Sequence, residues 1–176
     1  MIKVAVIGTH GTRKTTICHQ VIAGLKKREI NAEYLGEIAR NIPAGLYINE
    51  ATTRESQEWI LHEQIAKEIE YSGRKDIDVL VCDRGVIDNY MYYVYKFGSN
   101  PALDMLVNSR MKTYAGLFKL PIKKLLLNCD LVRATDPVFQ KAIDDLLEKE
   151  LKERGILFQR YKGLETTINK IIALRR

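Results

Sequence analysis

The sequence predicts an α/β fold in which a five-stranded, mainly parallel sheet is covered by helices on both faces. Two observations support this fold. Short apolar segments alternate with amphipathic helical segments along the whole chain, and polar or charged residues follow the apolar segments at their ends. Strands that alternate with helices form parallel sheets joined by right-handed crossovers. Both faces of such a sheet are buried, so three layers are expected: helices, sheet and helices.

The first strand and the first helix are predicted from the amino-terminal residues. Residues 2–7 (IKVAVI) are mostly apolar, and this run stops at Gly8. A helix is expected from Lys14 to about Arg28. Its apolar residues recur at the spacing of one helical face, namely Ile17, Val21, Ile22 and Leu25.

The middle of the chain adds two strands and three helices. Residues 31–36 are expected to form the second strand, and residues 78–83 (DVLVCD) a buried third strand that ends in a carboxylate. Between them, residues 53–72 carry apolar side chains at helical spacing, which indicates a long helix. Residues 87–95 and 103–114 are read as two further helices.

The carboxyl-terminal third supplies the remaining elements. The fourth strand is expected at residues 122–128, which include three consecutive leucines, and the fifth at residues 156–161. Between them, residues 138–154 are strongly amphipathic and predict a helix with acids and lysines on its outer face. Residues 164–174 are expected to form a final helix.

Length and composition indicate one globular domain over residues 1–176. Apolar residues make up 46% of the chain and charged residues 28%, which is ordinary for a folded domain. No apolar run approaches the roughly 18 to 20 residues of a membrane span. The chain leads from Met1 almost directly into the first strand, so no signal peptide is recognised. A cytoplasmic protein without membrane association is expected.

The net charge of +6, with a pI near 9.2, favours anionic partners such as nucleotides or phosphorylated metabolites. Short basic groups lie mostly where helices begin or end, and there cations complement the helix dipole. Nucleic-acid binding is therefore disfavoured, and an RNA-binding module is a third alternative that depends on net charge alone. The sequence indicates no oligomeric state.

The cysteines and histidines suggest neither a disulfide framework nor a metal centre. Cys18, Cys82 and Cys129 are isolated in apolar segments, which is typical of reduced, buried thiols. The histidines have no partner at the spacing of metal ligands. His10 is the one to follow, because it lies inside the loop described next.

Residues 8–16 (GTHGTRKTT) have the arrangement of a phosphate-binding loop: a strand, a glycine turn, then a lysine and two threonines that open a helix. Consecutive amides and the helix N-terminus would surround a phosphate, and a lysine would reach the terminal phosphates of a nucleotide. Each residue of this loop is therefore a candidate nucleotide ligand. They are Gly8, Thr9, His10, Gly11, Thr12, Arg13, Lys14, Thr15 and Thr16.

Specific roles follow for the last residues of this loop. Lys14 is expected to contact the β- and γ-phosphates of ATP, Thr15 to place its hydroxyl on Mg²⁺, and Thr16 to bond the α-phosphate. The pattern G-x-x-x-x-G-K-[ST] requires glycine at position 13, where this chain has Arg13. An arginine is expected to fit only if its φ is below zero and its side chain points away from the phosphates.

Candidate site residues also follow the second, third and fourth predicted strands. In parallel sheets, ligands bind at the carboxyl ends of the strands. Asp83 ends the third strand, where a carboxylate can hold Mg²⁺ or its waters; the alternative is an N-cap for the next helix. Arg84 can clamp the acceptor or the transferring phosphate, or it can simply pair with Asp83 or Asp88.

Two further residues complete the candidate catalytic set. Glu37 follows the second strand and can accept a proton from an acceptor hydroxyl, or it is a solvated helix start. Arg133 lies before the amphipathic helix and can close over the nucleotide to stabilise transition-state charge, or it forms a surface pair with Asp130. The tyrosines at 90, 92, 93 and 95 can stack a base, although packing is the expected role for most of them.

With these residues identified, the chain resembles the P-loop nucleoside and nucleotide kinases, most closely the NadR-like, AAA-type small kinase-like ATPases. Thymidylate and deoxynucleoside kinases are more loosely similar. The matching segments are GTHGTRKTT (8–16), GEIAR (36–40), VLVCDRGVIDNYMYY (79–93) and DLVRATDPVFQKAIDDLLEKEL (130–151). The resemblance implies a P-loop NTPase fold. It also implies that Glu37 and the Asp83–Arg84 pair handle the acceptor and the metal.

The function expected from these observations is transfer of the γ-phosphate of Mg·ATP to a nucleoside, nucleotide or similar small acceptor. The resemblance names no specific acceptor. A nucleotide-binding sensor or ATPase without a small-molecule acceptor is the main alternative, because Arg13 replaces the loop glycine. A regulatory GTPase is disfavoured, since the D-x-x-G and N-K-x-D patterns are missing, and so is an ABC-type ATPase, which lacks its signature helix.

Overall fold

Five parallel strands form one sheet in the computed structural model, which describes residues 1–48, 51–122 and 136–175. The order across the sheet is β2-β3-β1-β4-β5, and every neighbouring pair is parallel. This confirms the five-stranded parallel sheet predicted from sequence. The strands are β1 (Ile2–Ile7), β2 (Ala32–Leu35), β3 (Val79–Asp83), β4 (Gly116–Lys119) and β5 (Gln159–Arg160).

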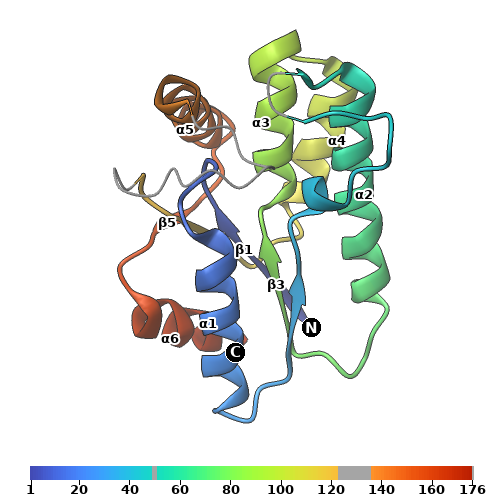
Figure 1. Ribbon diagram of the computed structural model, residues 1–176. Helices are drawn as coiled ribbons and strands as arrows, with labels where there is room; N and C mark the ends of the chain where they lie inside the picture. The colour runs from blue at the N-terminus through green and yellow to red at the C-terminus, as the bar shows by residue number, and fades with distance from the viewer. Residues whose placement is uncertain (49–50, 123–135, 176) are drawn as a thin grey trace.

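Helices connect the strands and cover both faces of the sheet (Figure 1). They begin close to the positions expected from their apolar stripes. Thr53 and Asn100 accept backbone N–H groups as N-caps of the helices that follow them. The helices are α1 (Lys14–Lys26), the short 3₁₀ helix η1 (Ile38–Asn41), α2 (Arg54–Ser72), α3 (Val86–Phe97), α4 (Pro101–Met111), α5 (Pro137–Glu153) and α6 (Leu164–Ala173).

The two faces of the sheet bury separate apolar clusters, because side chains alternate along each strand. Val4 and Val6 of β1 point to the side that α1 and α6 cover, whereas Ala5 and Ile7 point to the side covered by α2, α3, α4 and α5. In Figure 1, α1 and α6 lie together below the sheet, away from the group of α2, α3 and α4. The three-layer α/β/α fold is therefore confirmed.

The strand register brings the carboxyl ends of the central strands to one edge. Val6 lies opposite Asp83 in the β1–β3 pair, and Ile7 lies opposite Lys119 in the β1–β4 pair. The loop after β1 and the turn after β3 therefore leave the sheet side by side. This register places the candidate site.

The position predicted for the fourth strand is wrong. The strand that pairs with β1 is Gly116–Lys119, and Ile122 lies outside any strand. Residues 123–128 of the predicted strand lie outside the described part of the chain. The short β4 has little apolar signal because it ends in Lys119. That lysine is nonetheless buried, since its ammonium lies 2.7 Å from the carboxylate of Asp144 on α5.

Smaller differences affect two other elements. The helix expected to reach residue 114 ends at Met111, and the fifth strand shortens to Gln159–Arg160. Cys18 and Cys82 are buried free thiols, as predicted, whereas Cys129 lies outside the described residues. Over the described ranges, no helix combines the length and the apolar character needed to cross a bilayer.

The contact between α1 and α6 leads to a stability prediction. A Cβ atom at Gly24 would lie 2.3 Å from Cδ1 of the fully buried Ile168. We expect Gly24→Ala to destabilise the protein by about 1 kcal/mol, because overpacking outweighs the gain in helix propensity. In an Ile168→Val background, which lacks that atom, the same change should stabilise by about 1 kcal/mol. Urea denaturation of the four proteins measures this coupling, and strictly additive effects would contradict it.

Candidate functional site

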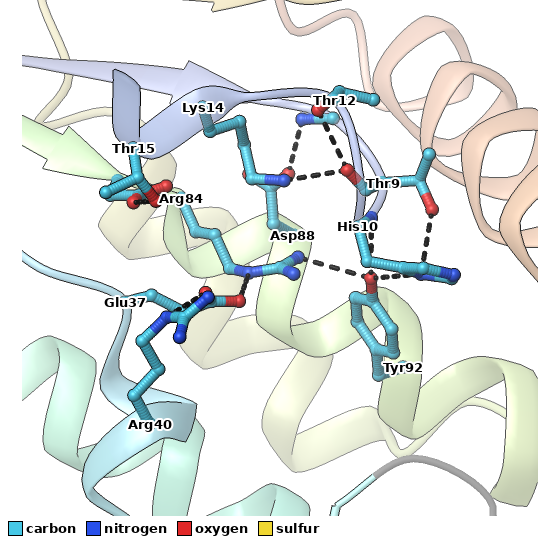
Figure 2. Close-up of polar contacts among 12 residues, drawn as sticks. Thr9, His10, Thr12, Lys14, Thr15, Glu37, Arg40, Arg84, Asp88 and Tyr92 are labelled. Atoms are coloured by element: carbon cyan, nitrogen blue, oxygen red, sulfur yellow. Dashed lines mark hydrogen bonds and ion pairs between the residues drawn. The ribbon is translucent and has the colours of Figure 1, made fainter. Parts of the chain in front are cut away.

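The loop between β1 and α1 has a left-handed backbone conformation at three positions. Gly8, Gly11 and Arg13 have φ values of 137°, 71° and 64°. Gly8 is also needed for space, because a Cβ there would lie 3.2 Å from the carbonyl oxygen of Leu120. The side chain of Thr12 donates to the carbonyl of Thr9 at 3.0 Å, which closes the turn (Figure 2).

The structure contradicts the backbone conformation that the sequence analysis expected for Arg13. A negative φ is expected for an arginine at this position, but the residue has φ 64° and ψ 30°, the left-handed region that glycine adopts without strain. For an L-residue this conformation costs about 1–2 kcal/mol. Its side chain is exposed, and it provides no side-chain cap for α1. The loop thus keeps the backbone shape of a phosphate-binding loop despite the substitution.

Lys14 begins α1 and turns back over the loop. Its Nζ donates to the carbonyl oxygen of Thr9 at 2.7 Å, and the side chain is almost completely buried (Figure 2). Burial, and next the nearby cation of Arg84, lower the pKa of Lys14 to about 8. The lysine therefore loses its charge as the pH rises through about 8, and a bound polyphosphate would favour its charged form.

Thr15 and Asp83 meet where a magnesium ion is expected. The Thr15 hydroxyl donates to Oδ2 of Asp83 at 2.5 Å, and the Tyr34 hydroxyl donates to the same oxygen at 3.0 Å. The other carboxylate oxygen, Oδ1, is buried and accepts no hydrogen bond from the described residues. A hydroxyl and a carboxylate are hard oxygen donors, and Mg²⁺ commonly takes one or two protein ligands and completes its shell with water and phosphate. This pair fits such an ion.

The alternative in which Asp83 caps the next helix is wrong. The N-cap of α3 is Gly85, and its amide donates to Asp88 Oδ2 at 2.9 Å. The second oxygen of Asp88 accepts the amide of Gly8 at 2.7 Å. Asp88 therefore joins the loop after β1 to the turn after β3. Burial raises the pKa of this carboxyl group, against the opposing effect of Arg84.

Arg84 pairs with Glu37, and neither of the expected partners Asp83 and Asp88 forms an ion pair with it among the described residues. Arg84 Nε lies 2.7 Å from Glu37 Oε1, and Arg40 Nε lies 3.0 Å from the other oxygen (Figure 2). Glu37 is not a solvated helix start, because only 13% of its side chain is exposed. Burial raises its pKa, but Arg84 and then Lys14 outweigh this effect and lower the pKa to about 2.

One pocket is lined by residues from three of these segments: the loop, the end of β3 and the start of η1. The lining residues are His10, Gly11, Thr12, Arg13, Lys14, Thr15, Glu37, Asp83 and Arg84. The sequence prediction that residues after the first three strands converge is thus supported by geometry. Thr16 is exposed on α1, and Arg133 with Asp130 lies outside the described residues.

Two residues beside the site, Tyr34 and Gln140, were missed by the sequence prediction, and Tyr92 makes polar contacts that the prediction did not include. Tyr92 accepts the His10 amide at 3.2 Å and lies 3.3 Å from Arg84 Nη1 (Figure 2). Tyr34 bonds Asp83, and Gln140 of α5 donates to the His10 carbonyl at 2.7 Å. Only Tyr92 carried a signal, because it follows Asp88 by four residues and so shares its helical face. Of its neighbours, Tyr90 and Tyr93 are core residues, as predicted, and Tyr95 is exposed.

Comparison with known proteins identifies the family. The sequence model described as an AAA domain matches residues 3–164. The chain belongs to this AAA domain family. No curated protein matches its sequence. The family match and the phosphate-loop geometry agree on a nucleotide-binding P-loop NTPase.

Two solved structures share the fold of this AAA domain. The NadR protein in complex with NR superposes with a TM-score of 0.75, and NadR in complex with NAD and AMP-PNP with 0.71. Sequence identity is 16% in both cases. The alignments cover 99% of this chain but only 51% and 49% of the NadR chains, so it spans about half of their length. The predicted P-loop NTPase fold of the NadR-like type is confirmed.

The left-handed backbone at position 13 predicts different effects for two substitutions. Arg13→Ala keeps the Cβ atom and the strain, so we expect stability close to that of the parent protein. Arg13→Gly removes the strain and should be about 1 kcal/mol more stable than Arg13→Ala, after allowing for the greater freedom of glycine in the unfolded chain. Urea denaturation measures the difference. Equal stability of the two variants would show that the backbone at this position is not strained.

The lowered pKa of Lys14 predicts that nucleotide affinity depends on pH. Only the charged lysine attracts phosphates, and its charged fraction falls as pH rises through about 8. We expect the Kd for ADP to increase by up to about tenfold between pH 7 and pH 9. Isothermal titration calorimetry provides the measurement. Lys14→Met is the control and should show a flat profile over this range; an equal slope in both proteins would assign the effect to another group.

Proposed function

We propose that this AAA domain, over residues 1–176, is a small-molecule kinase that transfers the γ-phosphate of Mg·ATP to a nucleoside, nucleotide or similar small acceptor. The observation that carries the proposal is the buried Arg84–Glu37 pair beside the phosphate loop, in the same pocket as Lys14 and Asp83. Binding a nucleotide needs only the loop and the metal pair. A cation and a carboxylate held next to them suit the transfer step.

The phosphate loop is the proposed donor site. Lys14 would exchange its bond to Thr9 for contacts with the β- and γ-phosphates, and the amides from Gly8 to Lys14 would surround the β-phosphate. Thr16 would bond the α-phosphate. Thr15 and Asp83 would hold Mg²⁺, which neutralises charge on the phosphates when bound. The likeness to NadR, which has been solved with AMP-PNP, supports an adenine nucleotide as donor.

Arg84 and Glu37 are the proposed acceptor-side residues. Phosphoryl transfer passes through a loose transition state, so positioning and charge neutralisation matter more than proton removal. Glu37, with its pKa near 2, is ionised at neutral pH and is suited to orient an acceptor hydroxyl by accepting its hydrogen bond. Arg84 would neutralise charge on the transferring phosphate. Arg133 stays a proposed closing residue, and the NR bound by NadR supports a nucleoside-like acceptor.

A nucleotide sensor or ATPase without an acceptor is the second candidate. The strained Arg13 favours it, because a cation in the loop can alter how the phosphates are seated. ATP binding by the Arg13→Gly protein distinguishes the two cases. Affinity that rises strongly would mean that the arginine restrains binding, as in a sensor. Unchanged affinity would mean that the loop tolerates it.

The kinase proposal is tested by incubating the protein with labelled Mg·ATP and a panel of nucleosides, nucleotides and small metabolites. We expect transfer to at least one acceptor. Lys14→Ala should reduce it at least a hundredfold, because the transferring phosphate loses its main cation. Asp83→Asn should raise the Mg²⁺ concentration needed for half-maximal rate by about tenfold, as a ligand charge is lost.

Lys26→Ala is the matched control, because it removes an exposed lysine from the far end of the same helix. It should leave the transfer rate unchanged. If the panel shows only background transfer and Lys14→Ala changes nothing, the kinase proposal fails and the sensor remains.

A further inference from the structure

The turn that carries Arg84 has an unusual backbone. Arg84 has a φ of 87°, which places a large side chain in the left-handed region. Such strain persists only where the surrounding structure determines the conformation. The Arg84 amide donates to the Val6 carbonyl at 3.2 Å, and the carboxylate of Asp88 accepts the amide of the next residue, Gly85. Two more hydrogen bonds hold the same turn.

These two bonds come from residues outside the site. The amide of Val86 donates to the hydroxyl of Tyr114 at 2.9 Å, and the carbonyl of Arg84 accepts from Gln64 Nε2 at 3.4 Å. Tyr114 precedes β4, and Gln64 lies in the middle of α2. Together with the bonds to β1 and α3, three elements and the segment before β4 thus hold one turn.

Glu68 connects the two supporting side chains. Its Oε1 accepts from both the Tyr114 hydroxyl and Gln64 Nε2, the latter at 2.8 Å. Its Oε2 pairs with the ammonium of Lys3, which also lies 4.0 Å from the centre of the Tyr114 ring. Glu68 is only 2% exposed. We call Lys3, Gln64, Glu68 and Tyr114 the Glu68 network.

A buried ion pair of this kind adds little stability compared with apolar residues of the same size, because desolvation offsets the attraction. Its hydrogen bonds, however, are directional. The carboxylate fixes the rotamers of Tyr114 and Gln64, and each of these fixes one backbone group of the turn that bears Arg84. The network therefore holds the backbone from which the Arg84 side chain extends.

We propose that the Glu68 network positions Arg84 against Glu37, and thereby sets the rate of phosphoryl transfer without contacting any substrate. This inference rests on the proposed function, in which Arg84 acts on the transferring phosphate. The members of the network are positioning residues. None of them bonds the phosphate loop through an interaction described here, so nucleotide affinity should not depend on them.

Tyr114→Phe is the decisive variant, and Tyr90→Phe is its matched control. Both remove a tyrosine hydroxyl that accepts a backbone amide, from Val86 in one case and from Asn100 at 3.0 Å in the other. Only Tyr114→Phe affects the turn of Arg84. We expect it to lower kcat about ten- to a hundredfold, with KM for ATP within about twofold of the parent value. Tyr90→Phe should change neither parameter.

A second measurement does not depend on turnover. The Arg84 Nε–H group, bonded to Glu37, should give a slowly exchanging signal in ¹⁵N NMR spectra of the folded protein. This signal should exchange faster or disappear in Tyr114→Phe and in Gln64→Met, and persist in Tyr90→Phe. Gln64→Met serves alone if Tyr114→Phe does not fold, because it removes the other bond to the turn.

The outcomes separate the two proposals. If the parent protein transfers no phosphate but the Arg84 signal responds as expected, the positioning role stands and the proposed function fails. If transfer occurs and both network variants behave like Tyr90→Phe in kcat and in the NMR signal, the positioning role is overturned and the proposed function stands.

Discussion

The carboxylate of Asp88 joins the two loops from which the site is built. One oxygen accepts the amide of Gly8 after β1, and the other accepts the amide of Gly85 after β3. Each of these amides is buried, and a buried amide without an acceptor costs about 1–3 kcal/mol. The phosphate loop and the turn of Arg84 therefore cannot move apart without losing an ionic hydrogen bond. Asp88 therefore helps to set the distance between the phosphate loop and Arg84.

The charged side chains near Asp88 influence one another's ionisation. Lys14 and Arg84 are both buried cations. Arg84 helps to lower the pKa of Lys14, and both cations help to keep Glu37 ionised. Asp83 faces Thr15 on one side of the loop, and Glu37 faces Arg84 on the other. The proposed metal site and the proposed acceptor site thus have separate carboxylates.

The parts of the fold that depend on local pattern were predictable from sequence. β1 and β3 are uninterrupted apolar runs, and the helices α1 and α5 follow clear apolar stripes. β4 was misplaced because its signal is not local. Lys119 has the sequence character of a surface residue, and it is buried in the sheet because the distant helix α5 supplies the carboxylates of Asp144 and Glu148.

The same distinction applies to the site. The phosphate loop, Asp83, Arg84 and Glu37 could be found because each lies directly after a predicted strand. The partner of Arg84 and the role of Asp88 could not, since their contacts span 47 and 80 residues of sequence. Arg13 shows the limit of a local rule. Side-chain sterics favour a negative φ for arginine, but the strand before it and the helix after it impose the conformation of the missing glycine.

The carbonyl of Thr9 accepts a hydrogen bond from Lys14, the side chain expected to bind phosphate. This carbonyl therefore competes with an incoming anion for the ammonium group. An anion that draws the ammonium away from this carbonyl costs the loop a hydrogen bond to a charged group, which contributes about 1.5–3 kcal/mol. A polyphosphate with several oxygens recovers that loss, whereas a single small anion recovers much less of it. The folded-back lysine would therefore favour anions with several charges over small, singly charged ones.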